Sequence, residues 1–343
     1  MIDFRYHLVS IVAVFLALGV GLLIGATALQ PTALAGLYKT SQQERKQIDA
    51  ALTTNSQLNR QINSNDQFAE SATGLLIGQL LAGERVVLVQ APGASSEVVN
   101  GVTRTLTAAG ATISGQVQLE DKFFDVSPAT QEQLGQLAQQ FTPVGVTLQG
   151  GTPLAQASQV IAGAIVTRDG PGQPVAGQRD SAAAALLSGF AAGGFLAISG
   201  HPDARATLAV VVIPENPPPP NGPDTASQGL VTFAQQLDQA GQGTVVAGSV
   251  AGSGPGSAID VMRSGEAGHM SSVDDADHTI GQIVVVQALY EQLRGGSGNY
   301  GSTSSAAMAG PSPAPTPPAT SAGAAGLQTT GRHTPHGTRA GNS

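Results

Sequence analysis

The residues best suited to bind a metal ion lie between positions 262 and 278. His269, Met270 and His278 combine imidazole nitrogen with thioether sulfur, and Met262 adds a second sulfur atom. These donors suit Cu(II) and Cu(I), whereas carboxylates suit harder cations. His269, Met270 and His278 are therefore the candidate ligands for copper. We expect weak binding, because the stretch offers two thioethers and no thiolate.

Three carboxylates in the same stretch favour a different role for it. Asp274, Asp275 and Asp277 directly precede a helix that we expect to begin near Ile280. Carboxylates at that position stabilise the positive N-terminal end of a helix and accept hydrogen bonds from its free N–H groups. We favour this capping role, and a metal site or a partner-binding loop are the alternatives.

Other kinds of chemistry have little support in the chain. It contains no Cys, which excludes disulfides, zinc-finger spacing and a Cys nucleophile. Residues 90–96 and 199–202 follow expected strands, where α/β sheets bind ligands, but the first segment lacks a GxGxxG spacing and a Walker lysine. In the second segment, Ser199 and His201 lack a third group that would orient them for catalysis. We therefore predict no catalytic residues and a protein that is not an enzyme.

The composition excludes several functional classes. Only 11% of the 343 residues are charged, against roughly a quarter in ordinary soluble domains. The formal net charge of −8 argues against nucleic-acid binding. Aromatic residues make up 4% of the chain, too few for the aromatic girdles of a lipid-spanning barrel.

Strand and helix patterns alternate through residues 74–296, which we interpret as one globular domain. Short β-branched or apolar runs are typical of buried parallel strands. They occur at 86–90, 111–119, 195–199, 208–213 and 244–247. Helices are expected near 95–109, 128–140, 154–165, 182–192, 224–240 and 280–293, and those at 128–140 and 280–293 are amphipathic. This alternation predicts the α/β fold class, with a mainly parallel, doubly wound sheet covered by helices on both faces.

One N-terminal segment is long and apolar enough to span a membrane. Leu8 to Leu29 are uncharged and form about 33 Å of helix, which matches a bilayer core. Ala26 and Ala28 fit a signal-peptidase site, but the apolar run is longer than a usual signal peptide core and Arg5 is the only Lys or Arg before it. We therefore predict an uncleaved single-pass anchor over residues 1–35, with the globular domain on the extracytoplasmic side.

Small residues recur along one face of this anchor and predict self-association. They are Ala13, Ala17, Gly21 and Gly25. Such a stripe lets two helix backbones approach closely. The alternative is the ordinary enrichment of Ala and Gly in a Gly-rich chain.

Residues 36–73 read as a polar helical stalk. Apolar residues recur there with roughly heptad spacing, at Ile48, Leu52, Leu58, Ile62 and Ala69. This pattern predicts a coiled coil, most simply in a parallel homodimer, and a solitary linking helix is the alternative. We expect Gly74 to interrupt the helix.

At the other end of the chain, residues 297–343 hold six Pro and no Asp or Glu. The rest of this segment is mainly Gly, Ser, Thr and Ala, which cannot bury a core. We predict a disordered tail.

Two motifs resemble the actinobacterial MctB family of copper transport proteins. The first is Arg5-x-His7-x-Val9-Ser10, followed by the apolar run Ala13-Val14-Phe15-Leu16-Ala17-Leu18 and by Gly21 and Gly25. The second begins with Ser271-Ser272-Val273-Asp274-Asp275-x-Asp277 and ends at Tyr300-Gly301. The resemblance covers residues 1–301. It implies copper homeostasis and efflux at the cell envelope, and no copper ligands of the family map onto this chain.

Two functional hypotheses remain open at this point. The first is a component of copper transport or homeostasis, which the resemblance implies. The second is a non-catalytic envelope scaffold or regulator in cell-wall or division machinery, with an envelope protein as partner. An anchor, a stalk, an α/β head and a Pro-rich tail fit this second role equally well.

Overall fold

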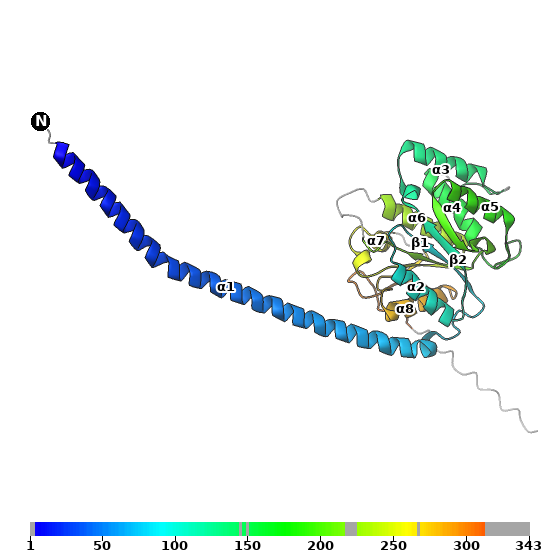
Figure 1. Cartoon of the computed structure of the whole chain (residues 1–343). Coiled ribbons are helices and arrows are strands. Elements are labelled where there is room, and N and C mark those ends of the chain that lie inside the picture. The colour runs from blue at the N-terminus through cyan, green and yellow to red at the C-terminus, as the bar shows by residue number, and fades with distance from the viewer. Residues whose placement is uncertain (1–3, 144–145, 149–150, 217–224, 266–267, 313–343) are drawn as a thin grey trace, which may run out of the picture.

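A single helix runs from the N-terminus into the globular head. In the computed structural model, α1 spans Phe4–Ile77, so the expected anchor and stalk form one continuous curved rod (Figure 1). The structure describes residues 4–143, 146–148, 151–216, 225–265 and 268–312, and the predicted tail from residue 313 lies outside them. The prediction that Gly74 interrupts the helix is wrong. Ile77 and Leu81 beyond it are buried in the head, and this packing outweighs the cost of about 1 kcal/mol for a helical glycine.

The first part of α1 has the length and composition of a membrane span. Tyr6–Gly25 has a mean hydropathy of 2.7 and no buried residues, and it is the only such helix in the described part of the chain. About 40 residues of helix separate Gly25 from Asp66, which accepts a hydrogen bond from the head. This length corresponds to about 60 Å.

Seven strands form one sheet within the described residues, in the order β3-β2-β1-β4-β5-β6-β7. The strands are β1 (Arg85–Gln90), β2 (Thr112–Leu119), β3 (Leu196–Gly200), β4 (Leu208–Val212), β5 (Gly243–Ala247), β6 (Ser271–Val273) and β7 (Asn299–Tyr300). All neighbours pair in parallel except β3, which is antiparallel to β2. The predicted fold class is confirmed.

Helices cover both faces of this sheet (Figure 1). One face carries α3 (Pro128–Gln140), α4 (Pro153–Ile165), α5 (Ser181–Ala192), α6 (Thr225–Ala240) and α7 (Ala258–Ser264), and the other carries α2 (Ser96–Ala108), α8 (Thr279–Gln292) and the end of α1. The central strand β1 explains this arrangement. Val87 and Val89 belong to the apolar core on the α6 face, whereas Val86 and Leu88 belong to the core on the α8 face.

The structure contains short elements that the sequence pattern did not predict. They are α7, β6, β7 and the 3-10 turns η1 (Asp121–Phe124), η2 (Pro202–Ala204) and η3 (Ala251–Ser253). The last strand corrects the boundary of the tail, because residues 297–312 lie on the head. Tyr300 is buried there and forms a bridge with Met308.

Candidate functional site

The two methionines of the predicted copper stretch are buried in the core. Met262 on α7 and Met270 before β6 expose 1% and 2% of their surface. Both belong to the apolar core on the α6 face. His269, their neighbour, is exposed and lines a surface hollow with Asp238 and Arg168. Burial raises the pKa of Asp238, and the nearby charges of His269 and Arg168 oppose this shift.

His278 lies at the stalk–head junction, where α1 meets the N-terminal end of α8. Its Nδ1 atom is 3.2 Å from Asp66 Oδ2 on α1. The backbone N–H of Thr279 donates to the other oxygen of Asp66 at 3.0 Å. A carboxylate from α1 therefore caps α8 from 213 residues away in the sequence. The prediction that the acidic run before α8 accepts these hydrogen bonds is wrong. Asp274 pairs instead with Arg263 and Ser302, and the side chains of Asp275 and Asp277 accept no hydrogen bond from the first turn of α8 in the described ranges.

Asp274 holds the C-terminal segment of the head in place. Its buried carboxylate pairs with Arg263, at 2.6 Å between Nη1 and Oδ2, and accepts a hydrogen bond from the Ser302 N–H at 2.8 Å. Arg263 also donates to the carbonyl of Tyr300 at 2.7 Å. Burial opposes ionisation of Asp274, but hydrogen bonds from Thr303 and Arg263 outweigh it and lower the pKa of this carboxyl. These contacts to Tyr300 and Ser302 explain why the first part of the predicted tail is packed on the head.

Asp275 lies in an environment unfavourable to its charge. Burial, followed by the negative charges of Asp274 and Asp277, raises its pKa to about 6. Among the described residues, no hydrogen-bond partner reaches the buried Oδ1 atoms of Asp275 and Asp277. Gly281 packs against the backbone carbonyl of Asp275, where the Cβ of any other residue would collide. The turn before α8 is therefore closely packed and electrostatically costly.

The structure places the predicted copper ligands in three different surroundings. Met270 is in the core on the α6 face, His269 faces Asp238, and His278 pairs with Asp66 on the face that carries α8. No group of three His, Cys, Asp or Glu side chains in the described ranges is arranged to hold one metal ion. Copper binding by His269, Met270 and His278 stays a prediction.

The segment 199–202 contains a histidine close to a carboxylate. Ser199 lies on β3 at the edge of the sheet, and His201 is exposed. His201 Nδ1 is 3.9 Å from Asp203 Oδ1, too far for a hydrogen bond. The Oδ2 atom of Asp203 pairs with Arg179 at 3.0 Å. No hydrogen bond joins Ser199 to His201 in the described part of the chain, so these contacts do not activate a nucleophile.

Sequence reasoning missed Asp66 and Arg263, the two residues that organise this region. A signal for Asp66 was present, because it lies three residues before Ala69 on the same face of α1. Ala69 is buried against the head, in the core on the α8 face. Arg263 had no comparable signal, since its partners are 11 and 37 residues away in the sequence.

Comparison with known proteins identifies the family of this chain. Residues 1–311 match the family described as "Copper transport outer membrane protein, MctB". The chain belongs to the MctB family. Proteins named copper transporter MctB from Mycobacterium tuberculosis and Mycobacterium leprae are each 28% identical to it over 313 residues, which is 88% of this chain and 96% of theirs. The resemblance first identified in two motifs thus extends through α1 and the head.

Membership of the MctB family supports a role in copper transport or homeostasis. The relatives are named as transporters and not as enzymes. The apolar first part of α1 fits a membrane-associated protein, in line with the family description.

Proposed function

We propose that this protein is a membrane-anchored component of copper efflux in the cell envelope. In this proposal, Tyr6–Gly25 is an uncleaved anchor and the head lies on the extracytoplasmic side. The match to the MctB family over both anchor and head is the observation that supports it best. Copper is the cargo, and the residues that contact it are not assigned.

Deleting the gene and measuring growth over a range of copper concentrations tests this function. We expect the deletion strain to be more sensitive to copper and to accumulate more of it, and expression of the full chain to restore both. Unchanged copper tolerance and copper content would contradict the proposal. Sequencing the N-terminus of the membrane-purified protein tests the anchor, because a chain that begins near Leu29 would show cleavage.

We also propose that two copies associate through α1. A single uncharged helix cannot line an aqueous path by itself, so transport requires several copies or a further partner. Space for close helix contact is available, because a Cβ added at Gly21 or Gly25 would meet nothing within 4 Å. Further along α1, Ile48, Leu52 and Leu58 each expose more than half of their surface. These apolar side chains support a coiled coil outside the membrane.

Isoleucine substitutions in the anchor test this association. Gly21→Ile should weaken the dimer in detergent, because a bulky side chain forces the two backbones apart. Gly19→Ile is the matched control, because this position is also open but lies on the opposite side of the helix. Native mass spectrometry or light scattering reads out the oligomeric state. A wild-type monomer, or equal effects of the two substitutions, would contradict the proposal.

A non-catalytic envelope scaffold is the second candidate. It is favoured by the long helix that holds the head about 60 Å from the membrane span, and by the lack of a grouped metal site in the described ranges. The deletion strain separates the two functions. Altered cell shape with normal copper tolerance would favour the scaffold, and copper sensitivity with normal shape would favour efflux.

A further inference from the structure

A crevice lies at the point where the order of the strands in the sheet reverses. From β1 the chain continues to β2 and β3 on one side, whereas β4 to β7 lie on the other. Doubly wound sheets bind ligands outside the carboxyl ends of the strands at such a switch point. The crevice measures about 380 Å³, within the usual range of small-molecule sites. Its lining residues follow β1, β2 and β4 or belong to the first turns of α6.

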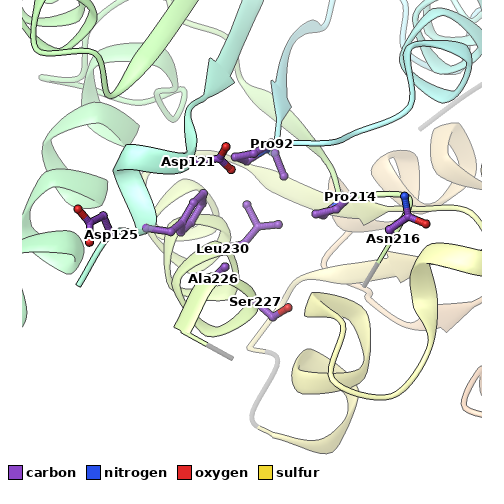
Figure 2. Close-up of a pocket in the computed structure, with 10 residues that line it drawn as sticks. Pro92, Asp121, Asp125, Pro214, Asn216, Ala226, Ser227 and Leu230 are labelled. Carbon is purple, nitrogen blue, oxygen red and sulfur yellow. The ribbon is translucent and has the colours of Figure 1, made fainter. Parts of the chain in front are cut away.

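The floor of the crevice is apolar. Leu230 lies between Pro92, Pro214 and Ala226 (Figure 2). Phe124 also lines the crevice, and both Leu230 and Phe124 are buried. These side chains come from four segments far apart in the sequence. An apolar group of a ligand would find contacts on several sides here.

Two carboxylates border this floor, and they differ in their availability. Asp125 is turned toward the start of α3, where it accepts hydrogen bonds from the Ser127 N–H at 2.9 Å and the Thr130 hydroxyl at 2.7 Å (Figure 2). The side chain of Asp121 lies beside Pro92 (Figure 2), is exposed, and makes no hydrogen bond or ion pair with the described residues. Asp121 is therefore the carboxylate available to a ligand.

No cation among the described residues lines the crevice to balance these charges. The nearby Lys122 points elsewhere, since its Nζ atom donates to the Gly193 carbonyl at 2.8 Å and to Gln133 at 3.0 Å. The β1–α2 turn also lacks the glycine spacing of a dinucleotide site, and Pro92 has no N–H to offer. Phosphorylated ligands are therefore disfavoured.

We propose that this crevice binds a small organic cation with an apolar body. The ammonium or guanidinium group would pair with Asp121, and the apolar body would rest on Phe124 and Leu230. Charge-assisted hydrogen bonds to a carboxylate are about twice as strong as neutral ones. The cation therefore sets the selectivity of the site, and the apolar floor provides the contact area.

Three probes of equal size test the proposal on the full chain in detergent. They are phenethylammonium, the neutral 2-phenylethanol and the anion phenylacetate, each titrated while the NMR signals of the head are recorded. We expect saturable binding of phenethylammonium in the millimolar range, weaker binding of 2-phenylethanol and no binding of phenylacetate. Equal binding of cation and anion, or no saturable binding of any probe, would overturn the proposal.

Two substitutions separate the charge from the shape of the crevice. Asp121→Asn should weaken phenethylammonium binding about tenfold, the loss of one charge-assisted contact, and leave 2-phenylethanol unaffected. Ala226→Leu should fill the crevice and weaken both probes. Asp169→Asn and Ala182→Leu make the same changes at exposed positions elsewhere and should have no effect. Unchanged binding in both Asp121→Asn and Ala226→Leu would show that the probes bind elsewhere and would refute the proposal.

Discussion

Replacing Asp275 by Asn should stabilise the head at neutral pH. In the folded state the pKa of Asp275 is raised from 3.8 to about 6 by burial and by the charges of Asp274 and Asp277. A shift of this size corresponds to a cost on the order of 3 kcal/mol when the carboxyl is ionised. Asn keeps the shape of the side chain and removes the charge. The expected gain at pH 7.5 is therefore on the order of 3 kcal/mol in the free energy of unfolding.

The pH dependence gives this prediction its sharpest test. Above pH 6 the carboxyl is ionised in both states and the full cost is present. Between pH 6 and 3.8 the folded state binds the proton first, so the cost falls, and below 3.8 it disappears. The advantage of Asp275→Asn should thus shrink by about half at pH 5. Urea denaturation of the full chain in detergent, followed by circular dichroism, measures it.

The control for this experiment removes the same charge from the surface. Asp169→Asn, at an exposed position, should change the stability by less than about 0.5 kcal/mol. If Asp275→Asn is neutral or destabilising at pH 7.5, or if its effect does not depend on pH, the reasoning about burial and like charges is refuted.

Three further predictions concern the junction, the C-terminal segment and copper. Asp66→Ala removes the cap of α8 and should destabilise the head by about 1 kcal/mol. Amide hydrogens at the start of α8 should then exchange faster with solvent, and an unchanged exchange rate would argue against the cap. Arg263→Met leaves the carboxylate of Asp274 buried without its partner and should lower the free energy of unfolding by about 3–5 kcal/mol. Residues 299–305 should then be cleaved faster by a protease, and a cleavage rate equal to that of the wild type would contradict the network. The double substitution His269→Ala with Met270→Ala should weaken binding in a titration with Cu(I) and Cu(II), because it removes an imidazole and a thioether of the predicted ligands; an affinity equal to that of the wild type would show that copper binds elsewhere.

The local elements of the head could be predicted because each has a long, regular pattern. The helix predicted at 128–140 is found at Pro128–Gln140, and the strand predicted at 86–90 is found at Arg85–Gln90. α7, β6 and β7 have seven, three and two residues, too few for a period to be visible. Their existence depends on contacts made by distant parts of the chain.

The site could not be predicted because nearness in sequence does not determine which face of the sheet a residue occupies. Met270, directly before β6, is buried in the core on the α6 face of the sheet. His278 is only eight residues later, but it lies on the opposite face, which carries α8, and contacts Asp66 of α1 there. The partner of His278 is Asp66, 212 residues away. No local pattern encodes a contact across that distance, so the pairing of His278 with Asp66 could not be predicted from the residue types between 262 and 278.

The predicted seam of the stalk is likewise split between two surroundings, solvent and the head. Ile48, Leu52 and Leu58 are exposed on α1, but Ala69, which continues their spacing, is buried against the head. A second copy of α1 can therefore pack along the seam only before the helix reaches the head. In a parallel dimer the two heads must then lie on either side of the paired helices. Because α1 is continuous and Asp66 fixes α8 to it, the proposed pairing of the two α1 helices would also set the orientation of each head.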